Sequence, residues 1–157
     1  MGSGSVNNRG QALVELAILL PLLLMLVLGI FEFGRAMYIK NTLTHAARAG
    51  ARAAVVSPNL TTGSVPANSN CSYPDFDSSD SSTYNSTSYA AACNSVYQGI
   101  PRDGKTVISV TVPQTPPKPG DMVTVKVTFD GFNTVVSKFL PIESKITLTG
   151  ETAMRYE

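Results

Sequence analysis

The hydrophobic and polar positions divide the chain into an apolar stretch, a polar stretch and an alternating stretch. From Leu16 to Phe31 no residue is charged, and apolar side chains lie all round the expected helix. At 1.5 Å per residue this run forms about 24 Å of helix, which Ala12–Val14 and Phe33 extend towards a hydrocarbon core of roughly 30 Å. The pattern predicts a membrane-inserted helix.

A cleaved secretory signal peptide is the alternative interpretation of this run. Its apolar core is shorter, about 7–15 residues, and basic residues precede it. Here Glu15 stands at the entry to the run, and the helical pattern continues beyond its end. Both observations favour the membrane helix.

The helical pattern continues from Phe31 to Val56 without a further proline. Apolar and small residues recur at helical spacing, namely Phe33, Met37, Leu43, Ala47, Gly50, Ala51 and Ala54. We expect one helix from Gln11 to Val56, on the order of 69 Å long, whose second half leaves the membrane. Pro21 is expected to act as either a harmless kink or a hinge.

A ladder of small residues at Ala46, Gly50 and Ala54 lies on the emergent half of this helix. Such a ladder lets another backbone approach closely, although alanine is also simply a good helix former. The stripe as a whole predicts a helix that packs lengthwise against another element.

Residues 57–104 are rich in Ser, Thr, Asn, Tyr and Ala, and predict a long loop region with a short helical turn near Tyr89–Val96. Cys71 and Cys93 flank part of it. A disulfide between them would remove roughly 3 kcal/mol of loop entropy from the unfolded chain, and it requires an oxidising compartment. Two buried thiols are the alternative.

Three carboxylates, Asp75, Asp77 and Asp80, stand close together in the same region. Clustered oxygens suit calcium, but the spacing lacks the glycine and the distal glutamate of an EF-hand loop. We expect a solvated acidic loop rather than a metal site.

Residues 105–157 alternate with the period of β-strands. In Lys105–Val112 the apolar Ile108, Val110 and Val112 share one face, and in Asp121–Phe129 Val123, Val125, Val127 and Phe129 share one. Ser144–Arg155 supplies a third strand. The expected fold class is therefore α+β: a long membrane helix packs by its C-terminal half on a small antiparallel sheet, in a pilin-like plan, with a disulfide-closed loop.

Composition excludes several functions. The net charge is +1, with five Lys and Arg against two acids in residues 1–56 and seven against nine in residues 57–157. This balance argues against nucleic-acid binding, which needs a basic excess. His45 is the one histidine, and it has no nucleophile or acidic pair nearby in the sequence. We expect neither an enzyme nor a cofactor.

The N-terminus carries a recognisable motif. The leader Met1–Gly10 is polar, Gln11 follows it, and Glu15 is the fifth residue of the apolar helix. This arrangement resembles the type IV prepilin signal, which implies cleavage after Gly10 by a prepilin peptidase. The freed amine of Gln11 would then pair with Glu15 of a neighbouring subunit, since a carboxylate in lipid needs a partner.

Further residues make the resemblance more specific. Arg9-Gly10-Gln11, Val14-Glu15, Pro21, Gly29, Gly34-Arg35-Ala36 and the run Ala46–Arg52 are similar to the N-terminal segment of TadE-like proteins, the pseudopilins of tight-adherence (Flp) pilus systems. Together with the stripe of small residues, this resemblance predicts packing between subunits through Glu15, Pro21, Ala46, Gly50 and Ala54. The family also implies other pilins and pseudopilins as partners.

The resulting hypothesis is a pseudopilin or minor pilin of the bacterial inner membrane, with a periplasmic or extracellular C-terminal domain. Its parts would be a leader (1–10), a transmembrane helix (11–34), an emergent helix (35–56), a loop region (57–104) and a sheet (105–157). The alternatives are an uncleaved single-pass envelope anchor and a surface adhesin whose loop region binds a partner.

Overall fold

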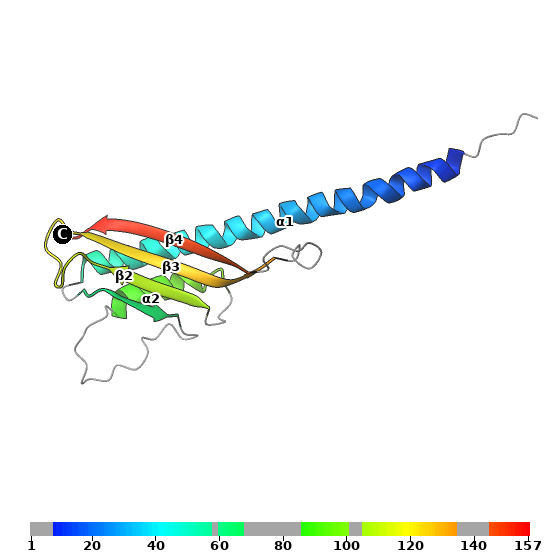
Figure 1. Cartoon of the computed structure of the whole chain (residues 1–157). Coiled ribbons are helices and arrows are strands. Elements are labelled where there is room, and N and C mark those ends of the chain that lie inside the picture. The colour runs from blue at the N-terminus through cyan, green and yellow to red at the C-terminus, as the bar shows by residue number, and fades with distance from the viewer. Residues whose placement is uncertain (1–7, 58–59, 68–85, 101–104, 135–144) are drawn as a thin grey trace, which may run out of the picture.

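A computed structural model describes residues 8–57, 60–67, 86–100, 105–134 and 145–157 of the chain. Its elements are α1 (Asn8–Val55), β1 (Gly63–Pro66), α2 (Ser86–Val96), β2 (Thr106–Thr111), β3 (Met122–Asn133) and β4 (Lys145–Arg155). The N-terminal half of α1 extends away from a head, which is formed by the remaining elements and the C-terminal half of α1 (Figure 1). The predicted α+β class is confirmed.

The long helix α1 is continuous over 48 residues, about 72 Å, and passes through Pro21. It ends where Ser57 turns back onto it, as the Ser57 hydroxyl donates to the carbonyl of Ala53 at 2.8 Å. The Tyr156 hydroxyl donates to the carbonyl of Ser57 at 2.8 Å, so the C-terminal segment of the chain is tied to the end of α1.

The sheet has four antiparallel strands in the order β1-β2-β3-β4. The three strands expected from the alternating stretch are present. The fourth strand, β1, lies in the region predicted as loop, where it pairs Val65 with Ile108 of β2. Its short sequence, GSVP, has too little alternation to be recognised as a strand.

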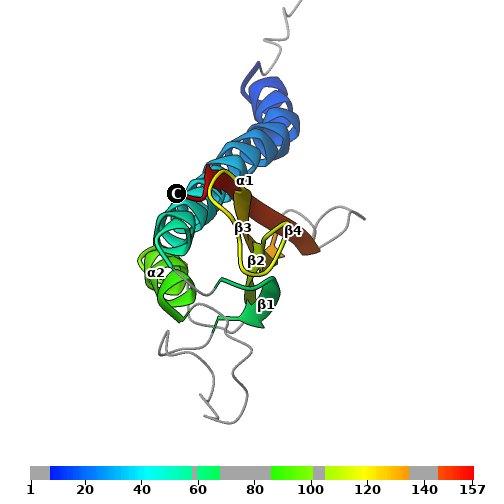
Figure 2. The same cartoon turned by 90° about the vertical axis from the view of Figure 1, so that its left-hand side faces the viewer.

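One face of the sheet is buried beneath the two helices, which lie side by side (Figure 2). The faces are those expected from alternation, since every second residue of β3 is buried from Val123 to Phe129 while Lys126 is exposed. The opposite face is polar, with a 2.9 Å hydrogen bond between the hydroxyls of Ser64 and Ser109. The head is therefore a two-layer structure with one core between helices and sheet.

Helix α2 is longer than the predicted helical turn near Tyr89–Val96, because it begins at Ser86. Its inward residues are Ser88, Tyr89, Ala92, Cys93 and Val96, all buried. They recur at the spacing of one helix face. The same periodicity is present in the sequence, and it indicates a complete helix inside the polar region.

The connection between β2 and β3 closes the end of the head far from the free half of α1 (Figure 1). The Asp121 carboxylate accepts hydrogen bonds from the Gln114 side-chain amide at 2.7 Å and from the Lys118 backbone N–H at 2.8 Å. Gly120 adopts a φ of 103°, which residues with a Cβ rarely take. These interactions hold the proline-rich connection in one shape.

Candidate functional site

The first candidate site is the free half of α1. From Gly10 to Phe31 every residue is exposed, with Ile18 and Leu22 about 70% accessible. An 18-residue stretch of this helix has a mean hydropathy of 2.8 and none of it is buried in the protein. So large an exposed apolar surface needs lipid or another helix to cover it. The helix is long and apolar enough to span a membrane.

The residues predicted for processing lie at the start of this helix. The helix begins at Asn8, so the Gly10–Gln11 bond lies in its first turn, and a Cβ on Gly10 would meet nothing within 4 Å. Glu15 lies about 6 Å further along the axis than Gln11 and is exposed. The geometry leaves Glu15 accessible to a neighbouring chain; cleavage after Gly10 stays a prediction.

The small-residue ladder is covered by other elements of the same chain. Ala46 and Ala54 are fully buried within the head, and Gly50 is buried between them. A Cβ on Gly50 would lie 3.0 Å from the Ala92 methyl group and 3.2 Å from a Val125 methyl group. The close approach predicted from the ladder occurs, but with α2 and β3 of the same chain. Packing of Ala46, Gly50 and Ala54 between subunits stays a prediction.

A polar contact joins α1 to the sheet just past the apolar stretch. The Arg35 guanidinium lies 5.1 Å from the centre of the Phe132 ring, and one of its nitrogens donates to the Asn133 carbonyl at 3.4 Å. Glu32, one turn earlier on the helix, is 7% exposed. These residues fix the end of β3 against α1, close to the exposed apolar half of that helix.

Of the residues predicted to act in the polar region, the structure describes Cys93. Cys93 is fully buried on α2, but Cys71 lies outside the described residues. Cys93 is disulfide-bonded, and the described residues include no free cysteine. Its pairing with Cys71 stays a prediction. Asp75, Asp77 and Asp80 also lie outside the described residues. Among the residues that are described, no three His, Cys, Asp or Glu side chains come together as metal ligands.

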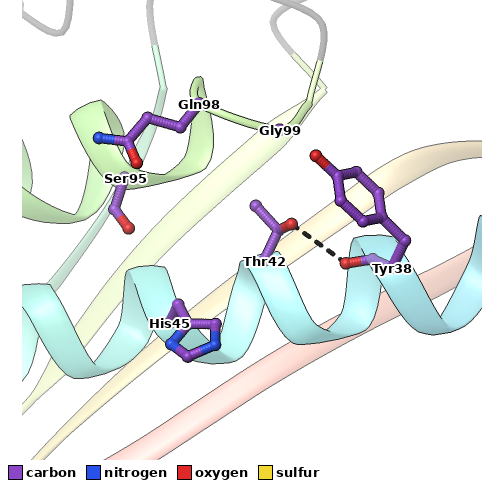
Figure 3. A pocket seen from close by; sticks show the side chains of 6 residues that line it. All are labelled: Tyr38, Thr42, His45, Ser95, Gln98 and Gly99. Carbon is purple, nitrogen blue, oxygen red and sulfur yellow. Dashed lines mark hydrogen bonds between the residues drawn. The ribbon is translucent and has the colours of Figure 1, made fainter.

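A pocket of about 290 Å³ opens between α1 and α2, which sequence reasoning did not find. Its lining residues are Tyr38, Thr42, His45, Ser95, Gln98 and Gly99 (Figure 3). The Thr42 hydroxyl is used within the helix, since it donates to the Tyr38 carbonyl at 3.0 Å. The lining carries no carboxylate.

The fold therefore defines a class of protein: an α+β head is attached to one long apolar helix. That helix is the right length and composition for a protein that crosses the membrane once. The family model of TadE-like protein matches residues 10–52 of the chain. The chain therefore carries a TadE-like domain, as its sequence predicted, and the match ends within α1. It supports a protein associated with a tight-adherence pilus system. Comparison with curated proteins gives no match, and comparison with solved structures gives none.

Proposed function

We propose that the chain is a pseudopilin or minor pilin of a tight-adherence pilus, processed after Gly10 and assembled through its N-terminal helix. The observation that carries the proposal is the TadE-like match over residues 10–52, which spans the Gly10–Gln11 bond, Glu15 and the exposed apolar helix. We further propose that the protein lies in the bacterial inner membrane with its head on the periplasmic side, and that it has no catalytic activity.

The mechanism follows from the positions of two charges. Cleavage after Gly10 would leave a cationic amine on Gln11, at the entry to the apolar stretch. Glu15 of a neighbouring chain, displaced by about 6 Å along the axis, would neutralise it. An isolated carboxylate is costly in lipid, by about 3 kcal/mol on insertion scales, so pairing would favour helices in one relative register.

The experiment that tests processing is mass spectrometry of the protein from cells that express a prepilin peptidase. We expect a chain that begins at Gln11, and an intact leader when the peptidase is absent. A chain that begins at Met1 in both cells, or cleavage at another bond, would remove the support for a pilin-like precursor.

The role of Glu15 is tested separately from cleavage. Glu15→Gln keeps the shape of the side chain and removes its charge, so it should still insert into the membrane but fail to cross-link to neighbouring pilins. Glu151→Gln is the matched control, because Glu151 is exposed on the polar face of the sheet. Equal cross-linking in both variants would contradict the pairing.

One observation favours the uncleaved single-pass anchor as a second candidate. The small residues of the emergent helix are used inside the head, and the outer face of that helix carries Asn41, His45, Arg48 and Arg52, all exposed. In a single-pass anchor this polar face simply stays in solvent, whereas a filament subunit must place it against neighbouring subunits or solvent. The mass of the mature chain decides between the two candidates.

The adhesin alternative needs a narrower test than removal of everything between Cys71 and Cys93. That deletion would remove most of α2, whose residues Ala92 and Cys93 belong to the core. Deletion of residues 75–80 leaves α2 in place. Unchanged surface attachment after this deletion would contradict an adhesive role of the acidic segment.

A further inference from the structure

One end of the sheet faces the membrane-spanning half of α1. At this end β3 stops and β4 starts, with Asn133 paired to Lys145 (Figure 1). The Asn133 carbonyl accepts the hydrogen bond from Arg35, which lies four residues, about 6 Å, past Phe31. Lipid headgroups occupy about that depth outside the hydrocarbon core. The β3–β4 end of the head therefore lies at the level of the headgroups when the apolar stretch is in the bilayer.

This end of the head carries three exposed cations, which we call the basic rim: Arg35, Lys105 and Lys145. Lys105 belongs to the rim because its side chain lies over Gly131, the residue that precedes Phe132. A Cβ built on Gly131 would lie 2.9 Å from the Lys105 Cδ. Among the described residues the acids near the rim are Glu32, which is buried, and Asp130, which accepts a hydrogen bond from the Thr147 hydroxyl. The three cations therefore outnumber these two acids by one at the described part of this end.

Exposed apolar side chains accompany the rim. Ile146 is 43% exposed beside Lys145, and on α1 Met37 and Tyr38 are 43% and 57% exposed. Aromatic and apolar side chains next to basic residues are typical of surfaces that lie at a membrane–water interface. Met122, 53% exposed, lies at the opposite end of β3 with the acidic Asp121 beside it.

We propose that the basic rim binds the phosphate groups of anionic phospholipids and holds the head against the bilayer surface. The partner is the lipid surface itself, because the cations lie at headgroup level and flank exposed apolar groups. Attraction between basic residues and anionic lipid falls off within a Debye length, so the contact requires the short distance between Phe31 and Arg35. The inference depends on membrane insertion of α1 and not on cleavage or on assembly into a pilus.

The test uses tryptophan, which the chain lacks. Ile146→Trp places a fluorophore at the rim, and Met122→Trp places one at the far end of the same sheet. Each full-length variant is reconstituted into vesicles of phosphatidylcholine alone, or of equal parts phosphatidylcholine and phosphatidylglycerol, with brominated chains as quenchers. We expect quenching at position 146 to rise about twofold in the anionic vesicles and to fall again in high salt. Quenching at position 122 should not change.

Charge variants show whether lipid binding depends on the lysines of the basic rim or only on the net charge of the protein. Lys105→Gln with Lys145→Gln, in the Ile146→Trp chain, should abolish the rise in quenching. Lys118→Gln with Lys126→Gln removes the same charge from exposed positions away from the rim and should retain it. Circular dichroism checks that each variant is folded. Equal quenching at position 146 in both kinds of vesicle, or an equal effect of the two charge pairs, would overturn the proposal.

Discussion

Gly150 of β4 lies directly against the backbone of Leu43 in α1. A Cβ on Gly150 would lie 2.6 Å from the Leu43 carbonyl oxygen and 2.5 Å from the Thr44 nitrogen, closer than real Cβ contacts. Backbone atoms cannot swing aside as a side chain can, so the strand crosses the helix at the smallest separation that glycine permits. Leu43, on the same turn of the helix, is fully buried as a result.

We predict that Gly150→Ala destabilises the head. The added methyl group has to push β4 away from α1, and overpacking of this kind costs about 1–3 kcal/mol or more. Urea unfolding of the full chain in detergent micelles, followed by circular dichroism, measures the loss. The matched control is Gly34→Ala, because a Cβ on Gly34 meets nothing within 4 Å. A loss no larger than that of the control would contradict the close crossing.

Ser88 provides a second test of the packing between α1 and α2. Its hydroxyl is buried and donates to the Gly50 carbonyl at 2.8 Å. Ser88→Ala should lower the free energy of unfolding by about 1 kcal/mol, the net value of one such hydrogen bond. Ser95→Ala, on the same helix and half-buried, should have a smaller effect. Equal losses would assign the effect to the helix as a whole instead of to this bond.

The contact between Arg35 and Phe132 predicts a measurable coupling. We expect a double-mutant cycle with Arg35→Gln and Phe132→Leu to give about 0.5–1 kcal/mol, as is usual for an exposed cation over an aromatic ring. Arg48→Gln in place of Arg35→Gln should be additive with Phe132→Leu. Additivity in both cycles would show that the Arg35 contact contributes nothing to stability.

The hydrogen bonds of Asp121, at the end of the head far from the apolar half of α1, predict that the stability of the fold depends on pH. The side-chain hydrogen bond from Gln114, and next the backbone N–H of Lys118, hold the pKa of Asp121 below its ordinary value of 3.8. Because the folded pKa is the lower one, the carboxylate stabilises the fold above its ordinary pKa, and this contribution is lost as the pH falls through the folded pKa.

The measurement for Asp121 is an NMR titration of its carboxyl carbon. Gln114→Ala should raise the pKa of Asp121 towards the ordinary value, since the largest cause of the shift is removed. Gln98→Ala, an exposed glutamine beside α2, should leave the titration unchanged. A pKa that does not respond to Gln114→Ala would contradict the hydrogen bond as its cause.

Much of the fold follows from local patterns in the sequence. The uncharged run and its helical continuation predict α1 because both depend on neighbouring residues along one chain segment. The alternation around Val125 likewise predicts β3 and the face that it buries. By contrast, β1 is four residues long and is a strand only because Val65 and its neighbours pair with β2. A partner distant in sequence leaves no signal in so short a segment.

The residues of the candidate sites likewise fall into those that the sequence reveals and those that only the fold brings together. Gly10, Gln11 and Glu15 were found from their spacing at the mouth of an apolar helix, and the family match covers all three. Gly50 was recognised as a place of close approach, yet the spacing of small residues cannot tell which backbone approaches. The pocket at Tyr38 and His45 was missed because its wall comes partly from α2, which follows α1 only after a polar region.

The sequence by itself therefore determined a long apolar helix, its polar entry at Glu15 and the alternating strands, since each depends on the order of adjacent residues. Only the tertiary structure decided what covers the small-residue face: α2 and β3 fill the space at Gly50, and β4 crosses at Gly150. The reason is physical. A small residue specifies how near a neighbour can come, whereas the identity of that neighbour depends on which buried surfaces in the whole chain fit together.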